Sequence, residues 1–366
     1  MIFPDILAHD VPVIRPSRKK PMFVMQPPLR EYLVRHGRMT QLAVDYKDLL
    51  QFNYSMPLRD RHGRNTVWES VSYDSHAWNY LKEVLVNTYA KLRTEGDLSF
   101  VTQLELARVD YCPFGNSRPF RIRIVNKYND NYDLYYVKSA DASRVYGLEL
   151  EHILSPNRMT YLTYNDTLVE EHIPGIPGDV FIQQYLQDES LNKIRLAKEF
   201  VKFNERCFAR LLGDMRSYNF VVNVSPDVED FQYRIRAIDF DQQSYEGRKN
   251  LYLPQFLKEN YPLVALTLDV LNKVSIEQYQ AEERTMMAFR LVAARYRLKD
   301  LLDIMADDNI STTPKIEELC EGLAEYFHSK AYAKCHSMGE VVKTNLKQLL
   351  RKNLSLVPKM RGRYDD

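Results

Sequence analysis

The sequence predicts an α+β fold in which strands and helices are separated along the chain. Between residues 97 and 173, short segments with the period of a strand surround one helical segment. A Pro- and Gly-rich breaker, "IPGIPGD", follows at residues 173–179, and beyond it the pattern is helical apart from one hairpin. Runs of strands followed by runs of helices are typical of α+β proteins.

Length and composition narrow the class of protein. The chain has 366 residues, 45% of them hydrophobic, which is enough for two or three domains with a sizeable core. Its net charge of +1 gives no global field that would steer it toward nucleic acid. The first 14 residues lack the basic start of a secretory signal, and no apolar run approaches the ~20 residues of a membrane span. We expect a cytoplasmic protein with no nucleic-acid partner and no membrane span.

Residues 1–96 are expected to form an N-terminal extension that is mostly helical or irregular. Prolines punctuate residues 16–28, which predicts an irregular segment. Residues 76–92 place apolar side chains at helical spacing, which predicts a helix.

Residues 97–173 read as a small sheet domain. "FRIRIV" at residues 120–125 alternates apolar and basic side chains, the period of a strand with one buried face. The expected order is three strands, a helix and two strands, at residues 99–111, 120–125, 134–140, 143–154 and 160–173.

Residues 174–366 are expected to be mostly helical. Apolar side chains from Leu196 to Leu211 recur on one face of a long helix. A hairpin follows at residues 219–241, and from residue 251 to residue 350 the pattern is helical throughout.

The junction between the long helix and the hairpin carries the strongest functional signal. "GDMRSYN" places Asp214, Arg216 and Asn219 within six positions, and the hairpin ends in "IDFD" with Asp239 and Asp241. Phosphoryl transfer needs such residues, because it depends on positioning and charge neutralisation. Carboxylate and amide oxygens are also ligands that Mg²⁺ favours.

"GDMRSYN" followed by "IDFD" resembles the catalytic core of the protein-kinase-like superfamily, in particular the "HGDxxxxN…IDF" arrangement of aminoglycoside phosphotransferases and other atypical kinases. The resemblance implies a bilobal fold. A small antiparallel-sheet N-lobe would span residues 97–173 and a mostly helical C-lobe residues 174–366, after the extra N-terminal helical segment.

The resemblance also implies roles for these residues. Asp214 matches the catalytic-loop aspartate, and Arg216 stands where many protein kinases place a lysine that faces the transferred phosphoryl group. Asn219 and Asp239 match the two Mg²⁺ ligands. Asp241 occupies the glycine position of the Asp-Phe-Gly motif, so it is either an additional ligand or the true ligand in place of Asp239.

The expected ATP site lies upstream. Lys138 resembles the third-strand lysine that binds the α- and β-phosphates, and Glu149 is chosen as its partner because it lies on the apolar face of the following helix. The backbone of residues Glu171, His172 and Ile173 would meet adenine.

The loop at residues 111–119 stands where kinases have their glycine-rich loop. It has one glycine, Gly115, and no GxGxxG, and Ser117 or Arg118 is a candidate for phosphate contact in its place.

These assignments predict an ATP- and Mg²⁺-dependent phosphotransferase that acts on a hydroxyl of a protein or a small molecule. Two alternatives remain open. A pseudokinase that serves as a nucleotide-binding scaffold would explain the glycine-poor loop, and a kinase-like fold can also transfer AMP instead of phosphate.

Overall fold

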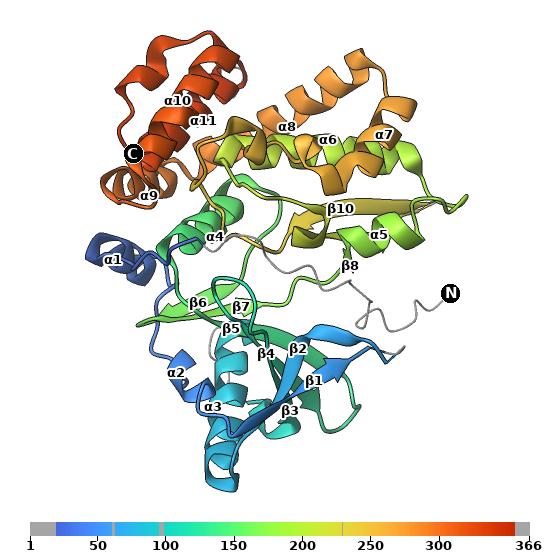
Figure 1. Ribbon diagram of the computed structural model, residues 1–366, viewed down its shortest axis with the longest axis vertical. Coiled ribbons are helices and arrows are strands. Elements are labelled where there is room, and N and C mark those ends of the chain that lie inside the picture. The colour runs from blue at the N-terminus through green and yellow to red at the C-terminus, as the bar shows by residue number, and fades with distance from the viewer. Residues whose placement is uncertain (1–19, 61–62, 95–98, 229, 356–366) are drawn as a thin grey trace, which may run out of the picture. The chain divides into compact units, whose positions relative to one another are not determined.

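The computed structural model describes residues 20–60, 63–94, 99–228 and 230–355. It divides into an N-terminal unit, residues 1–145 and 159–180, and a C-terminal unit, residues 146–158 and 181–366. The former holds a seven-stranded antiparallel sheet and the latter most of the helices, so the predicted α+β class is confirmed (Figure 1). Among the described residues, no helix combines the length and apolar character needed to cross a bilayer.

The sheet of the N-terminal unit has the strand order β1-β2-β3-β4-β5-β7-β6, with antiparallel neighbours throughout. The strands are β1 Tyr54–Arg59, β2 Asn65–Ser72, β3 Leu104–Tyr111, β4 Phe120–Asn126, β5 Tyr132–Ser139, β6 Tyr161–Tyr164 and β7 Thr167–Glu171. Strands β3 to β7 overlap the five predicted strand segments, but β3 begins at Leu104, because a 3₁₀ turn at Val101–Gln103 occupies the start of the first segment.

The sheet extends further toward the N-terminus than the sequence predicts. In the segment 1–96, helices α1 Pro27–Arg35, α2 Tyr46–Leu49 and α3 Ser75–Thr94 agree with the expected helical character. Strands β1 and β2 in the same segment were not expected. Their signal is weak because β1 contains Pro57 and lies at the edge of the sheet, and only Val71 of β2 is fully buried.

The two faces of this sheet have opposite character. Successive residues of a strand point to opposite faces, and the register places Phe120, Val137 and Val169 opposite one another. They belong to an apolar core that α3 completes by packing against β3, β4 and β7 (Figure 1). The neighbouring row, on the other face, is polar and consists of Asp110, Arg121, Tyr136 and Glu170.

Helix α4, Ala142–Leu154, follows β5 and crosses from the first unit into the second. Strand β8 Ile176–Pro177 and helix α5 Gly178–Gln184 occupy the predicted breaker and the residues after it. The C-terminal unit contains α6 Lys193–Arg210, β9 Phe220–Pro226, β10 Phe231–Ala237, α7 Tyr261–Val270, α8 Lys273–Ala293, α9 Arg295–Asp307, α10 Thr313–Phe327 and α11 Met338–Leu354.

Helix α6 organises the C-terminal unit, since α7, α8, α11 and β10 all pack against it. Its predicted apolar face is buried, at Leu196, Phe200, Phe203 and Cys207. Asn192 caps its first turn by accepting a hydrogen bond from the backbone N–H of Arg195 at 3.0 Å.

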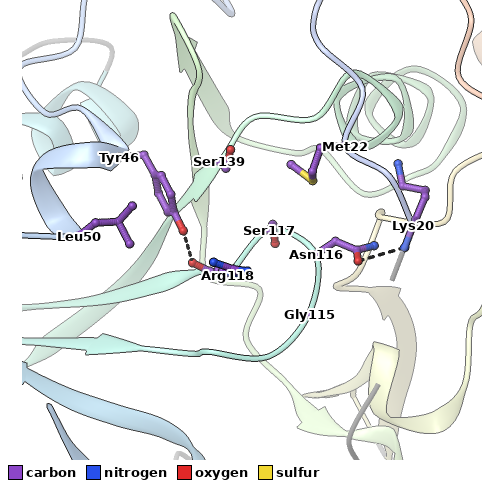
Figure 2. A pocket seen from close by; sticks show the side chains of 9 residues that line it. All are labelled: Lys20, Met22, Tyr46, Leu50, Gly115, Asn116, Ser117, Arg118 and Ser139. Carbon is purple, nitrogen blue, oxygen red and sulfur yellow. Dashed lines mark hydrogen bonds between the residues drawn. The ribbon is translucent and has the colours of Figure 1, made fainter. Parts of the chain in front are cut away.

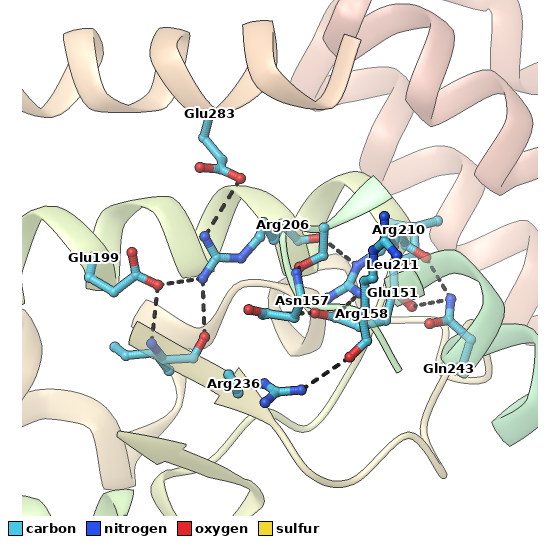
Figure 3. Close-up of polar contacts among 12 residues, drawn as sticks. Glu151, Asn157, Arg158, Glu199, Arg206, Arg210, Leu211, Arg236, Gln243 and Glu283 are labelled. Carbon is cyan, nitrogen blue, oxygen red and sulfur yellow. Dashed lines mark hydrogen bonds and ion pairs between the residues drawn. The ribbon is translucent and has the colours of Figure 1, made fainter. Parts of the chain in front are cut away.

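The polar contacts of two buried arginines, Arg206 and Arg210, fix α6 to its neighbours (Figure 3). The guanidinium of Arg206 donates to the carboxylate of Glu199 at 2.7 Å and to the carbonyl of Ile235 in β10 at 3.1 Å. Arg210 forms an ion pair with Glu151 of α4, and Asn157 donates to the same carboxylate at 3.1 Å. These contacts anchor β10 and α4 on the helix that leads into the predicted catalytic loop.

Candidate active site

The predicted catalytic loop leaves α6 through a left-handed residue, Leu211, with φ 54°. Leu212 then forms an antiparallel bridge with Gln243, and the N–H of Gly213 donates to the carbonyl of Gln242 at 3.1 Å. A Cβ atom at Gly213 would stand 3.1 Å from that oxygen and 3.2 Å from the ring of Tyr252. Glycine therefore allows the loop to lie directly against the segment after β10.

Side-chain bonds from Gln243 strengthen this junction. Its amide Nε2 donates to the carbonyl of Arg210 at 2.6 Å and to that of Leu211 at 3.3 Å (Figure 3). The N–H of Ser244 also donates to Leu211, at 2.9 Å. The loop that carries Asp214 is thus tied to the segment that carries Asp239 and Asp241.

The structure brings Asp214, Asn219 and the end of the hairpin together. The amide Nδ2 of Asn219 donates to the backbone carbonyl of Asp214 at 2.7 Å, and the N–H of Ile238 donates to the carbonyl of Asn219 at 3.0 Å. Burial raises the pKa of Tyr218 to about 12, and the negative charges of Asp214 and Asp239 both add to this effect. The positive charge of Arg216 opposes this rise in pKa.

The carboxylate of Asp214 is held in an ion-pair chain. Arg216 donates from Nε to Asp214 at 2.6 Å and from Nη1 to Glu259 at 2.6 Å. Burial raises the pKa of Asp214 above its ordinary value, Arg216 opposes this, and Glu259 and Glu246 add to it. A carboxylate whose pKa moves upward becomes a better proton acceptor. Sequence reasoning missed Glu259, which lies 43 positions from Arg216 in a short 3₁₀ turn.

The donor set suits Mg²⁺. The amide nitrogen of Asn219 is committed to the carbonyl of Asp214, and an amide oxygen is an atom type that Mg²⁺ favours. Asp239 accepts a bond from the N–H of Asp241 at 3.0 Å, and Asp241 is buried. Within the ranges that the structure describes, no three or more His, Cys, Asp or Glu residues gather into a metal site. An ion here would rely on the amide oxygen and on phosphate or water oxygens besides these carboxylates.

In the N-terminal unit, Lys138 lies on the polar face of the sheet. Its ammonium donates to Glu170 at 2.7 Å, and Arg144 forms an ion pair with the same carboxylate. All three side chains are buried. Burial alone would raise the pKa of Glu170, but the charges of Arg144 and Lys138 outweigh it and hold that pKa at about 2.

Within its unit, Lys138 pairs with Glu170, a residue that the sequence pattern did not single out. Glu149, the predicted partner, belongs to the other unit, so that pairing stays a prediction. In the C-terminal unit Glu149 is fully buried and accepts a hydrogen bond from Arg297 at 2.7 Å. The pairing register of strands β5 and β7 is the feature that identifies Glu170 as the partner of Lys138. Tyr136 lies opposite Glu170, so Lys138, two residues further on, is its diagonal neighbour on the same face.

The three residues expected to meet adenine end strand β7 and follow it. The N–H of Glu171 donates to the carbonyl of Thr160 at 3.1 Å and is committed to the protein. The side chain of Ile173 is buried. His172 is half-buried, and its Nδ1 lies 3.1 Å from the hydroxyl of Tyr136. That the backbone of His172 and Ile173 contacts adenine stays a prediction.

The imidazole of His172 is expected to titrate near pH 4. Burial lowers its pKa from 6.5 to about 4, so the neutral ring is the folded form at pH 7. The folded-state pKa of His172 lies below its unfolded value. The contribution of the neutral ring to the free energy of unfolding is therefore fully present above pH 6.5 and is lost as the pH falls toward 4. An NMR titration of the His172 ring measures this directly, and a midpoint near 6.5 would contradict it.

Gly115 and Ser117 lie in the loop between β3 and β4, where they line a cavity of about 310 Å³ (Figure 2). Ser139 of β5 also lines this cavity, whereas Lys138 does not. Since consecutive strand residues face opposite sides, the structure separates this loop's cavity from the polar face that carries Lys138.

Comparisons with known proteins add little to this geometry. No protein-family model and no curated protein matches the chain. Among solved structures, the PAN3 pseudokinase of Neurospora crassa aligns over 75% of this chain and 70% of its own, with 9% sequence identity and a TM-score of 0.18. A TM-score this low carries no argument, so function must be argued from the residues themselves.

Proposed function

We propose that this chain is an ATP- and Mg²⁺-dependent phosphotransferase of kinase-like architecture, acting on a hydroxyl of a protein or a small molecule. One observation supports this most. Hydrogen bonds bring the Asp214 loop, Asn219 and the segment that leads to Asp239 together within one compact unit. Phosphoryl transfer requires a positioned carboxylate next to oxygen ligands for a metal.

Each residue has a distinct role in this proposal. Asn219 and Asp239, with Asp241 as a further candidate, would hold Mg²⁺, which neutralises phosphate charge when bound. Asp214 accepts the proton of the acceptor hydroxyl. Arg216, held by Glu259 at 2.6 Å, presents a guanidinium beside that carboxylate and can stabilise negative charge on the transferred group.

In the N-terminal unit, Lys138 would bind the α- and β-phosphates of ATP. The ammonium of Lys138 is buried and lies 2.7 Å from the carboxylate of Glu170. The backbone of His172 and Ile173 would meet the adenine.

A nucleotide-binding scaffold is the second candidate. The 2.6 Å ion pair between Asp214 and Arg216 favours it, because the carboxylate already has a partner. The lack of GxGxxG in the loop at residues 111–119 points the same way. Transfer of AMP from ATP is a third candidate, and the experiment with labelled ATP described below distinguishes it from phosphoryl transfer.

The test incubates the full chain with Mg²⁺ and ATP labelled at either the γ- or the α-phosphate, together with protein and small-molecule acceptors. We expect transfer of the γ-label only, and loss of transfer in Asp239→Asn. Asp227→Asn is the matched control and should keep activity, since Asp227 is a half-buried residue of the hairpin turn that pairs with Arg195 at 3.0 Å. A thermal melt with Mg-ATP is run in parallel, since a ligand at 100 times its Kd stabilises the folded state by about 2.7 kcal/mol.

The outcomes separate the candidates. Transfer of the α-label identifies AMP transfer. Stabilisation by Mg-ATP without transfer of either label identifies a scaffold. The absence of both stabilisation and transfer contradicts nucleotide binding altogether.

A further inference from the structure

The cavity beside residues 115–118 has the features of an independent ligand site. It measures about 310 Å³ and lies wholly within the N-terminal unit, between the β3–β4 loop, helix α2 and the segment that begins at Lys20 (Figure 2). Small-molecule sites typically measure ~300–1,000 Å³. This volume suits a compact ligand better than an extended polyphosphate.

The cavity is separate from the proposed nucleotide site. Ser139 lines it and Lys138 does not, although the two residues are consecutive in β5. Tyr46, another lining residue, packs edge-on against Phe120, which belongs to the apolar core on the α3 face. The cavity therefore opens at the edge of the apolar face, and Lys138 belongs to the polar face.

The β3–β4 loop lines this cavity and has backbone N–H groups that bond to no acceptor in the described residues. The carbonyl of Ser117 accepts from the N–H of Ser139 at 3.4 Å, and the carbonyl of Arg118 accepts from the hydroxyl of Tyr46 at 2.9 Å. Within the described parts of the chain, the N–H groups of residues 115–118 donate to no protein acceptor. Two of these residues, Gly115 and Arg118, are left-handed, with φ 83° and φ 40°. Successive N–H groups in such a loop form a concavity that favours anions.

The side chains around the cavity have the same preference. Its lining contains two cations, Lys20 and Arg118, and no acidic residue. The ammonium of Lys20 is committed to Asp141 at 3.0 Å, whereas the Arg118 side chain is exposed and lies beside the phenol of Tyr111. Met22 and Leu50 add an apolar surface.

We propose that this cavity binds a small phosphate monoester, with the phosphate held by the backbone N–H groups of residues 115–118 and by the guanidinium of Arg118. The organic part of the ligand then contacts Met22 and Leu50. A non-glycine residue with positive φ, as at Arg118, is an uncommon and strained feature that a binding site accounts for.

The test is isothermal titration calorimetry on the full chain with ribose 5-phosphate, inorganic phosphate and uncharged ribose. We expect saturable binding of one or both phosphate probes and none of ribose. If the site also contacts the organic part of the ligand, ribose 5-phosphate will bind more tightly than inorganic phosphate. If the site contacts the phosphate alone, the two probes will bind with equal affinity. Arg118→Asn should weaken binding by about 10- to 100-fold, because it removes a charge-assisted hydrogen bond.

Asparagine suits this substitution because it tolerates the left-handed conformation, so the melting temperature of Arg118→Asn should not fall. Arg59→Asn removes an exposed cation elsewhere in the same unit and should bind like the wild type. Lys138→Met should also retain binding, which separates this site from the nucleotide site. Equal binding of ribose, unchanged binding by Arg118→Asn, or loss of binding in Lys138→Met would each overturn the proposal.

Discussion

Replacing Glu170 with glutamine is expected to lower the free energy of unfolding by about 3–5 kcal/mol, the usual cost of removing one member of a buried ion pair. The carboxylate is shared by Lys138 and Arg144, and all three side chains are buried. Glutamine keeps the shape but removes the charge, so two buried cations lose their common counter-charge. Denaturant unfolding followed by fluorescence measures the change.

The same carboxylate predicts a pH dependence. The pKa of Glu170 is about 2 in the folded chain against 4.5 for a free glutamate. A depressed folded-state pKa contributes stability above the unfolded value, and this contribution is lost as the pH falls from 4.5 toward 2. At 1.36 kcal/mol per pKa unit, the full loss is about 3 kcal/mol. The Glu170→Gln variant should lack this component.

Glu105→Gln is the matched control, because Glu105 is exposed and lies 3.5 Å from Lys82. An exposed pair contributes about 0–1 kcal/mol, so this variant should unfold like the wild type. If Glu170→Gln is destabilised no more than Glu105→Gln, the buried cluster does not support the sheet in the way described here.

The fold could be predicted from the sequence wherever one face of an element is buried. Residues 120–125 alternate apolar and basic side chains, and β4 forms there with its apolar residues in the core. The apolar face of α6 was equally clear. Strands β1 and β2 escaped prediction because β1 is exposed and contains Pro57, and pairing with β3 rather than hydrophobic periodicity places β2 in the sheet.

The site could be predicted in part, for a related physical reason. The hairpin after α6 brings Asn219 to the backbone of Asp214 and to Ile238, the neighbour of Asp239, as the order of the elements predicts. The metal-binding and catalytic roles of these residues stay predictions. The sequence did not predict the ion-pair partners of Lys138 and Arg216. Glu170 and Glu259 meet Lys138 and Arg216 through tertiary packing, and spacing along the chain carries no signal for such pairs.

Replacing Asp214 with asparagine is expected to lower the rate of phosphoryl transfer by about 10²–10⁴-fold, the usual contribution of a general base. Asparagine cannot accept the proton of the acceptor hydroxyl. The folded state should not be weakened. Arg216 keeps its 2.6 Å bond to Glu259, and burial raises the pKa of Asp214, so its charged form opposes folding near pH 7. Steady-state transfer of γ-labelled phosphate and a thermal melt measure both effects.

A pH profile distinguishes a base from a merely structural carboxylate. In the wild type, kcat/KM should rise with pH through the raised pKa of Asp214, because only the ionised carboxylate accepts a proton. Asp214→Asn should lose this acid limb and keep the KM for ATP. Asp269→Asn, on the exposed side of α7, should behave like the wild type in every measurement. A variant at position 214 that retains both rate and acid limb would mean that another group takes the proton, and the role given to this loop would be wrong.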